Sequence, residues 1–390
     1  MTIANTIQLG REAEIFVKAE TTIGTYAAPA ATDFIVSSGA PEFNQPVSLT
    51  DSTEVRNSRS LKDQFRDMTP AGSWSIPMYC RPSGTAGTPP DGAALLKAAF
   101  GTETISAGSN VTYSPAVDLP SVSITIKMKD MVWALVGATV NELKAALSSK
   151  GAINFDFSGG FMKLLWAGKA EIASASGTSV VLKSLVDAQK YRVGMKVQFY
   201  DVNTSSWKTN SGSGYAITAI DEDTFTLTIS PSVSEFTPAA YDILQGFVPT
   251  GTEVGTPIQA RTGTCEMLTA AVPIITMDIT LTNNTQYMED EVSTDEYPTA
   301  YVSDRRSVKA NATLYLRTND LKYFRRAQLQ TSVALEMLGG DTAGSKIEMV
   351  IPYAKGDFPA ISGDLQKQLS IGFTGVCSAA YEDELTLKFL

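Results

Sequence analysis

The sequence predicts a mainly β protein with a few short helices and an inserted small β domain. Most of the 390 residues lie in short runs that alternate apolar and polar side chains, separated by Gly, Pro, Asn and Asp. Only two stretches have clear helical patterning, and the strand runs become shorter and more evenly spaced between residues 168 and 246. Because a single core rarely serves so long a chain, we expect residues 1–167 and 248–390 to form one domain, interrupted by residues 168–247.

The first part of the chain predicts several strands and one helix. The helix is AALLKAAF, which follows the candidate N-cap Asp91 and ends at Gly101. Pro77 lacks a backbone donor, so the strand WSIPM favours a sheet edge. The segment VNELKAAL has a helical composition but also suits a strand, and both interpretations stay open. Further strands are expected at residues 11–18, 33–37, 111–116, 121–130, 131–139 and 151–161.

The inserted part and the remainder of the chain are also rich in strand patterns. The insertion predicts strands near residues 171–184, 191–201, 213–221, 223–233 and 241–246, and its net charge of −2 does not suit a basic reader of nucleic acid. Residues 248–259 have the Gly, Pro and Thr content of a linker. A second helix is expected to start at Asn319, among strands at residues 262–269, 273–284, 307–318, 333–340, 346–354, 368–375 and 384–389.

The composition argues against a catalytic or metal-binding protein. The chain has no histidine, and Cys80, Cys265 and Cys377 lie too far apart in sequence for a metal knuckle or a disulfide framework. The acidic groups at residues 288–297 and 382–384 are interpreted as solvated loop charge. We therefore expect no catalytic, cofactor or metal site. No segment suits a membrane span or a secretory signal, so the protein is expected to stay in the cytosol until it assembles.

The overall charge limits how this protein could meet DNA. A formal net charge of −10 argues against tight binding to phosphates, which needs clustered Lys and Arg. The same charge fits a conduit past which DNA slides without sticking as well as it fits an ordinary soluble protein, so alone it does not decide between them. Residues 46–72 are dense in mixed charge and poor in large apolar residues, which suits either an exposed loop or a long contact arm.

In order and coverage, the segments resemble the tail tube proteins (major tail proteins) of long-tailed, siphovirus-type bacteriophages. The matching pieces are GREAEIFVKAETTIGTYAAPAATDFIV, SGTAGTPPDGAALLKAAFG with VTYSP, SSKGAINFDFSGGF, GGDTAGSKIEMVIPYA and YEDELTLKF. The resemblance implies a β-sandwich with a flanking short α-helix, six copies of which form a ring lined by a β-barrel. Rings would stack into the tail tube that conducts DNA into the host. The insertion has no counterpart in shorter members and is expected on the tube exterior.

The resemblance also implies partners and contact residues. Residues 46–72 would be an arm that reaches the adjacent subunit or ring. The expected inter-subunit contacts are its charged residues, Asp51, Glu54, Arg56, Arg59, Lys62, Asp63, Arg66 and Asp67. Partners would be further copies of the chain, the tape measure protein and passing double-stranded DNA in the lumen, and tail terminator and distal tail proteins at the ends, with no membrane. A capsid decoration or baseplate component is the alternative; an enzyme is not expected.

Overall fold

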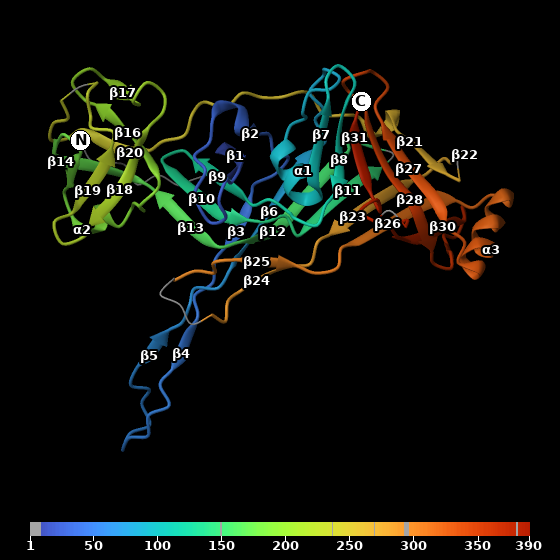
Figure 1. Ribbon diagram of the computed structural model, residues 1–390, viewed down its shortest axis with the longest axis horizontal. Coiled ribbons are helices and arrows are strands. Elements are labelled where there is room, and N and C mark those ends of the chain that lie inside the picture. Colours follow the sequence, from blue (N-terminus) through green and yellow to red (C-terminus); the bar gives the residue numbers. More distant parts are fainter. Residues whose placement is uncertain (1–8, 149, 236, 269, 292–295, 380) are drawn as a thin grey trace.

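The computed structural model describes residues 9–390 except 149, 236, 269, 292–295 and 380. These residues form an elongated body with a closed β-barrel at one end and helix α3 at the other (Figure 1). Strands dominate, and the helices are few and short. The expected mainly β fold with a short helix is therefore confirmed.

A long antiparallel sheet crosses the body and is here called the central sheet. Its strand order is β29-β30-β26-β23-β11-β12-β6-β3. Its bounds are β3 Glu42–Asn44, β6 Gly72–Tyr79, β11 Glu142–Ser148, β12 Asn154–Phe161, β23 Thr276–Thr282, β26 Ser307–Tyr315, β29 Ala360–Ser362 and β30 Gln368–Gly375. The strands from β30 to β6 alternate buried and less buried side chains, so one face of the sheet meets the core.

Two smaller sheets cover the apolar face of the central sheet. The first covering sheet has the order β13-β10-β9-β1-β2, and the second has β31-β28-β27-β21-β22. The first contains β1 Ala13–Ala19, β2 Phe34–Ile35, β9 Val122–Met128, β10 Met131–Ala138 and β13 Lys163–Ala167. The second contains β21 Thr264–Met267, β22 Ala270–Ala271, β27 Val333–Gly339, β28 Ile347–Gly356 and β31 Thr386–Phe389. β28 also pairs with β30, so it joins the second covering sheet to the central sheet.

One hydrophobic core runs between these layers along both halves of the chain. It joins central-sheet residues such as Phe157 and Ile279 to Ile126 of the first covering sheet and Leu335 of the second. The hairpin of β7 Gly101–Ser106 and β8 Asn110–Pro115 extends the second covering sheet, because β8 pairs with β31. Residues from the beginning and the end of the chain thus share one buried interior.

Two short helices flank the sandwich, and their caps differ from expectation. α1 Ala93–Phe100 buries Leu96 and ends at Gly101, whose φ of 101° favours glycine. Its N-cap is Gly92; Asp91 is instead buried and accepts a hydrogen bond from the Val36 backbone N–H. α3 Leu321–Leu329 has Asp320 as its N-cap, and Asn319 lies in the preceding 3-10 turn. Single 3-10 turns occur at Gly10–Glu12, Ala31–Asp33, Ala260–Thr262 and Thr318–Asp320.

Residues 169–246 form a closed barrel with its own core. Six strands close in the order β14-β15-β19-β18-β16-β20 and back to β14, with β17 added beside β16. The bounds are β14 Lys169–Ser176, β15 Ser179–Leu182, α2 Leu185–Ala188, β16 Lys196–Asp201, β17 Ser206–Lys208, β18 Tyr215–Asp221, β19 Thr226–Ser230 and β20 Ile243–Gly246. Gly246 N donates to Gly168 O over 2.9 Å, so the entry and exit of the barrel lie side by side.

The barrel packs on the first covering sheet, on the side away from the sandwich core. Its buried Tyr191 and Phe199 share a cluster with Val132 and Val136 of β10. Alternate residues of β10, such as Leu135, point into the sandwich core. Because neighbouring strand residues face opposite ways, the barrel and the central sheet lie on opposite sides of this covering sheet.

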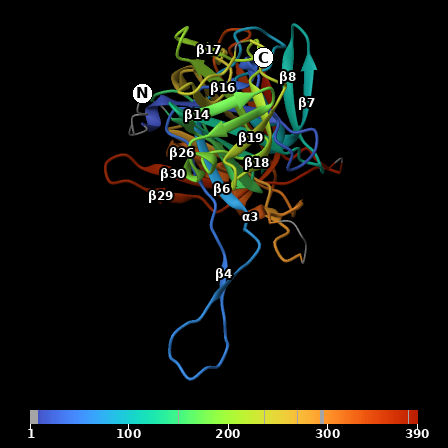
Figure 2. The same cartoon turned by 90° about the vertical axis from the view of Figure 1, so that its left-hand side faces the viewer.

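Two hairpins leave the central sheet between paired strands. β4 Leu49–Asp51 and β5 Gln64–Arg66 form a long arm that extends away from the body in both views (Figure 1, Figure 2). β24 Thr285–Tyr287 and β25 Tyr301–Ser303 form a shorter one. The arm connects β3 to β6, and the shorter hairpin connects β23 to β26.

Two strand predictions are resolved by the pairing. VNELKAAL is not a helix: its residues from Glu142 onward form β11 in the middle of the central sheet. The edge position expected for WSIPM is wrong, because β6 lies between β12 and β3. Pro77 is tolerated there because the ladder with β3 extends only to Ser75.

Candidate assembly surfaces

The arm, residues 46–71, exposes apolar side chains on a thin two-stranded ribbon. Val55 is fully exposed, and Val47, Leu49, Leu61 and Phe65 are each more than half exposed. Leu49 pairs with Arg66 and Thr50 pairs with Phe65, so apolar groups lie on both faces of the ribbon. A ribbon this thin cannot bury them by itself, and contiguous exposed apolar groups are typical of contact surfaces.

The structure places all eight predicted contact residues on this arm. Several of them pair within the arm itself. Glu54 accepts from Arg56 over 2.6 Å and lies 3.7 Å from Lys62 Nζ. Asp51 accepts from Gln64 and Asp67 accepts from Ser48 and Thr50, while Asp63 accepts from the Gln64 N–H. Arg59 has no ion-pair partner in the described part of the chain.

Sequence reasoning chose the charges of the arm and missed its apolar residues. A signal was present, because Val47 and Leu49 are two residues apart and therefore share one face of a strand. Since exposed ion pairs contribute little energy, the apolar groups are the stronger candidates for holding a partner, and the charges for setting its orientation.

The base of the arm leans on the shorter hairpin. Thr69 N donates to Glu296 O over 2.9 Å, and Ala71 N donates to the Glu289 carboxylate over 2.7 Å. Arg66 Nη1 lies 3.7 Å from Glu296. Some acids of the group at residues 288–297 therefore hold the arm in place, while residues 292–295 lie outside the described part.

The two ends of the central sheet are open edges. Among the described residues, β3 at one end pairs only with β6, and β29 at the other end pairs only with β30. All three residues of β29 are exposed, and Ile361 in it is 54% exposed although its cross-strand partner Leu369 is buried. The β29–β30 hairpin projects from the body in Figure 2. Open edges with apolar side chains invite another strand.

The face of the central sheet that points away from the core is polar. Its side chains are mainly Ser, Thr, Asn and charged residues, such as Thr280, Asn311 and Ser370. The charged side chains that alternate with buried ones on these strands are Glu42, Glu142, Asp156, Asp278, Lys144 and Lys309, which gives 2 − 4 = −2. Such a face offers no continuous positive patch to a phosphate backbone.

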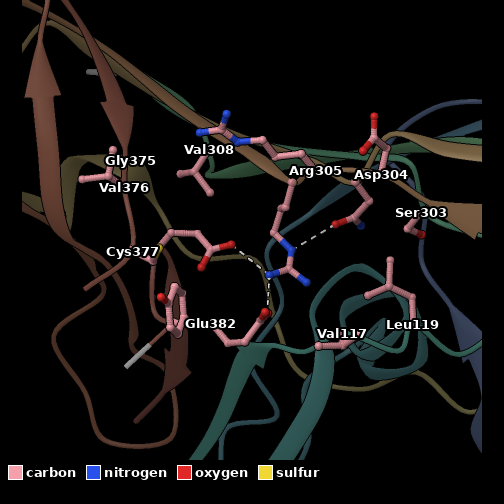
Figure 3. A pocket seen from close by; sticks show the side chains of 14 residues that line it. Val117, Leu119, Ser303, Asp304, Arg305, Val308, Gly375, Val376, Cys377 and Glu382 are labelled. Carbon is pink, nitrogen blue, oxygen red and sulfur yellow. Dashed lines mark hydrogen bonds and ion pairs between the residues drawn. The ribbon is translucent and has the colours of Figure 1, made fainter. Parts of the chain in front are cut away.

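Arg306, whose side chain is 13% exposed, ties the end of the chain to its first half and lines the pocket drawn in Figure 3. Arg306 Nη1 donates to Glu382 and Glu384 over 2.8 Å each, and Arg306 Nη2 donates to Ala116 O. Arg306 Nε reaches Asn283 over 3.4 Å. The Glu384 side chain is only 14% exposed, so the expectation of solvated loop charge is wrong for it. All three guanidinium nitrogens of Arg306 donate hydrogen bonds, so the residues of this pocket hold two parts of the chain together.

A second buried pair fixes the linker after the barrel. Arg81 Nη2 donates to Gly255 O over 2.9 Å and Nε donates to Val254 O over 3.2 Å. Arg81 Nε also lies 3.5 Å from Asp91 Oδ2, and Asp91 Oδ1 is buried with no hydrogen-bond partner among the described residues. Burial raises the pKa of Asp91 to about 6, against the lowering effects of the Val36 N–H and Arg81.

The described residues contain no group of three or more His, Cys, Asp or Glu side chains placed to hold a metal ion. Cys80 and Cys265 are buried and Cys377 is exposed, all as free thiols. Within the part of the chain that the structure covers, no helix is long and apolar enough to span a membrane. The exposed apolar residues of the arm and the open edges of the central sheet are the prominent surface features of the described residues.

Comparison with known proteins gives a match to one protein family. No curated protein matches the sequence significantly. The family model described as phage tail tube protein matches residues 10–375. That match covers both parts of the sandwich, the arm and the barrel. The chain belongs to the phage tail tube protein family.

Proposed function

We propose that this protein is a structural, non-enzymatic subunit that assembles into stacked rings and forms the conduit for DNA ejection. The family match carries this proposal, and it favours a tube subunit over a capsid decoration or baseplate component. Open edges on the central sheet supply lateral contacts, since joining them across subunits closes the sheet into a barrel. The expected ring has sixfold character.

The polar face of the central sheet is the proposed wall of the passage. Its few charges are of mixed sign with a small acidic excess, and its many hydroxyl side chains can bind water. A duplex that passes such a wall meets weak repulsion and no strong binding site. The tape measure protein would occupy the same passage before ejection.

The arm is the proposed contact with an adjacent subunit or ring. Val55, Leu61 and Phe65 would pack on the partner, and Arg59, Asp63 and the other charged residues of the arm would set the register. Tail terminator and distal tail proteins would meet the contact surfaces left open at the two ends of the tube.

The barrel is proposed as an inserted domain of residues 168–247 on the tube exterior. It packs on the side of the first covering sheet that faces away from the central sheet, so it does not reach the proposed passage. Residues 1–167 and 248–390 would then form the tube wall. The protein would fold in the host cytoplasm and reside in the virion tail.

Electron microscopy of the purified chain at rising concentration tests the proposal. Rings or hollow tubes with an open passage are the expected result. A species that remains monomeric at high concentration would contradict it. An arm-deleted chain, with residues 50–65 replaced by a two-residue turn, should remain folded and lose tubes, which separates assembly from folding.

A further inference from the structure

The two covering sheets have the same architecture, strand for strand. The first has the order β13-β10-β9-β1-β2 and the second β31-β28-β27-β21-β22, with every pairing antiparallel. Along the chain, β1, β2, β9, β10 and β13 appear in the same order as β21, β22, β27, β28 and β31. A 3-10 turn precedes the first strand in both cases.

The central sheet contains the same repeat. Strands β3, β6, β12 and β11 pair in sequence at one end, and β23, β26, β30 and β29 pair in the same sequence next to them. Helix α1 follows β6 as helix α3 follows β26. The arm lies between β3 and β6, and the shorter hairpin lies between β23 and β26. The chain therefore contains two tube units, unit 1 from β1 to β13 and unit 2 from β21 to β31.

A shared bulge shows that the correspondence extends to single residues. In β10 the register jumps from Leu135, paired with Ile124, to Ala138, paired with Val122. In β28 it jumps from Ile351, paired with Leu335, to Ala354, paired with Val333. Both jumps advance one strand by three residues and its partner by two. Bulges are specific local features, so this identity supports a true structural repeat.

The units differ at three places. The arm of unit 1 projects from the body, whereas the hairpin of unit 2 contacts the base of the arm through Glu289 and Glu296. Among the described residues the β7–β8 hairpin occurs only in unit 1, and the barrel lies between the units. β8 covers the outer edge of unit 2 by pairing with β31. The corresponding edge strand of unit 1, β13, instead meets the barrel, where Ala167 bridges to Tyr191.

The two units are already joined side by side within the chain. β11 of unit 1 pairs with β23 of unit 2 over seven residues, from Glu142 with Thr282 to Ser148 with Thr276. None of the residues in these two strands is exposed. The equivalents that remain open are β29, which corresponds to β11, and β3, which corresponds to β23. Within the central sheet, most residues of β29 and β3 are exposed, in contrast to those of β11 and β23.

We propose that β29 of one chain pairs with β3 of a second copy, reproducing the β11–β23 joint, and that three chains close a ring of six tube units. This inference rests on the proposed tube function and replaces the six-chain ring that the family resemblance implies. Matching the ladder ends of the two units, Ala146 with Asn154 and Ser362 with Gln368, carries the internal register over. It places Ala360 opposite Asn44 of the next copy and Ile361 opposite Phe43. The contact is head-to-tail and closes by rotation.

The width of the passage favours a ring of three chains over rings of two or six chains. Each chain supplies eight strands to the central sheet, so three chains give 3 × 8 = 24 strands. With strands about 4.8 Å apart and tilted by about 40°, a 24-stranded barrel is about 48 Å across between backbones. Inward side chains take about 5 Å on each side, which leaves about 38 Å for a duplex. Two chains would leave about 22 Å and six would leave about 86 Å by the same reckoning.

Cysteine cross-linking across the proposed joint tests both the edges and the count. The variant carries Glu42→Cys and Ser362→Cys, the equivalents of Asp278 and Ala146, in a Cys377→Ser background, which removes the exposed thiol. Tubes of this variant are oxidised, and the products are separated without reductant. We expect a ladder that ends at three chains, about 125 kDa from 3 × 41.7 kDa. The matched control, Ala146→Cys with Asp278→Cys in the same background, links the internal joint and should stay at one chain.

Each outcome has a defined meaning. A ladder that ends at six chains overturns the count, and tubes without inter-chain disulfides overturn the edge pairing, while both leave the proposed function standing. If the wild-type chain forms neither rings nor tubes, the proposed function fails and this inference with it. End-on images of wild-type rings give a substitution-free check: three barrels around each ring are expected, and six would overturn the inference.

Discussion

Leu147 of β11 and Ile361 of β29 both lie on the face of the central sheet that carries the buried side chains, yet Leu147 is 4% exposed and Ile361 is 54% exposed. Leu147 is covered because β11 pairs with β23, where it lies opposite Met277. Ile361 faces the same way as the buried Leu369 but has no strand on its other side among the described residues. The difference in exposure marks the surface that a second copy would cover.

Lysine substitutions at these two positions should have opposite effects. Ile361→Lys should leave thermal unfolding of the monomer unchanged, because the side chain is already in solvent, and should abolish rings. Leu147→Lys should lower unfolding free energy by about 3 kcal/mol or more, because it buries an unpaired charge. Calorimetry and electron microscopy of both variants measure this. Rings formed by Ile361→Lys would contradict the role of this edge.

The apolar residues of the arm should govern assembly without contributing to folding. Replacing Val55, Leu61 and Phe65 together by Ser should change the melting temperature little, because all three are more than half exposed. Tube formation, followed by light scattering, should be lost. The matched control replaces Arg59 by Ser, which should slow assembly in a salt-dependent way and not prevent it. Equal loss in both variants would argue against apolar contacts as the main attachment.

Asp91 should make stability depend on pH in a defined direction. Its folded pKa of about 6 lies above the ordinary aspartate value of 3.8, so the folded chain retains a proton that the unfolded chain releases. The stability from this group is therefore full below about pH 4 and is lost as the pH rises through about 6. A shift of about two units corresponds to about 3 kcal/mol.

The test for Asp91 uses Asp91→Asn, which stays neutral at every pH. The unfolding free energy of the wild type, minus that of the variant, should fall by about 3 kcal/mol between about pH 4 and pH 7. Urea titrations across this range measure it. A difference that stays flat, or that rises with pH, would show that Arg81 and the Val36 N–H outweigh the burial of the carboxylate.

Arg306 should be far more important for stability than its neighbour Arg305. Arg306→Ala leaves the nearly buried Glu384 without its cation, and we expect a loss of about 3 kcal/mol. Arg305 is exposed, so Arg305→Ala should change stability by less than about 0.5 kcal/mol. Thermal unfolding of the two variants provides the comparison. Similar melting temperatures would show that the C-terminal loop is held by other contacts.

Removing the barrel should leave the tube wall able to fold. Because Gly168 and Gly246 are hydrogen-bonded neighbours, deletion of residues 170–245 needs only a short turn to reconnect the chain. The deletion uncovers Phe16, Val132 and Val136, so Val132→Thr and Val136→Thr should accompany it to preserve solubility. Tubes of smaller outer diameter are expected by electron microscopy. An unfolded product would show that the barrel belongs to the core of the fold.

Much of the secondary structure could be predicted from the sequence, because alternation reports burial directly. The strands around Phe155 and Phe157 and the helix at residues 93–100 are found where the patterns indicate them. The capping role of Asp91 was wrong because a nearby charge and backbone donor hold its carboxylate away from the helix. Composition alone could not decide β11, whose strand state comes from its neighbours on both sides.

The duplication could not be predicted, because the two units share pairing and little sequence. The strand AEIFVKA in unit 1 corresponds to TCEM in unit 2, and these have few residues in common. Ile15 and Cys265 are both buried in the same core, but the outward Phe16 packs on the barrel while Glu266 meets no such cover. Equivalent residues of the two units have different neighbours, so different side chains occupy them. The repeat is visible only in the pattern of strand pairing.

The arm extends farther from the body than the described residues of the shorter hairpin (Figure 1), and this difference would affect how one ring sits on the next. In a ring of three chains, long and short projections alternate around the circle. A rotation by one tube unit would then place a long projection where a short one belongs, so neighbouring rings have three rotational settings in place of six. The stagger between rings along the tail would be fixed by this alternation, and a cap or tip that binds the end of the tube would need threefold symmetry to match it.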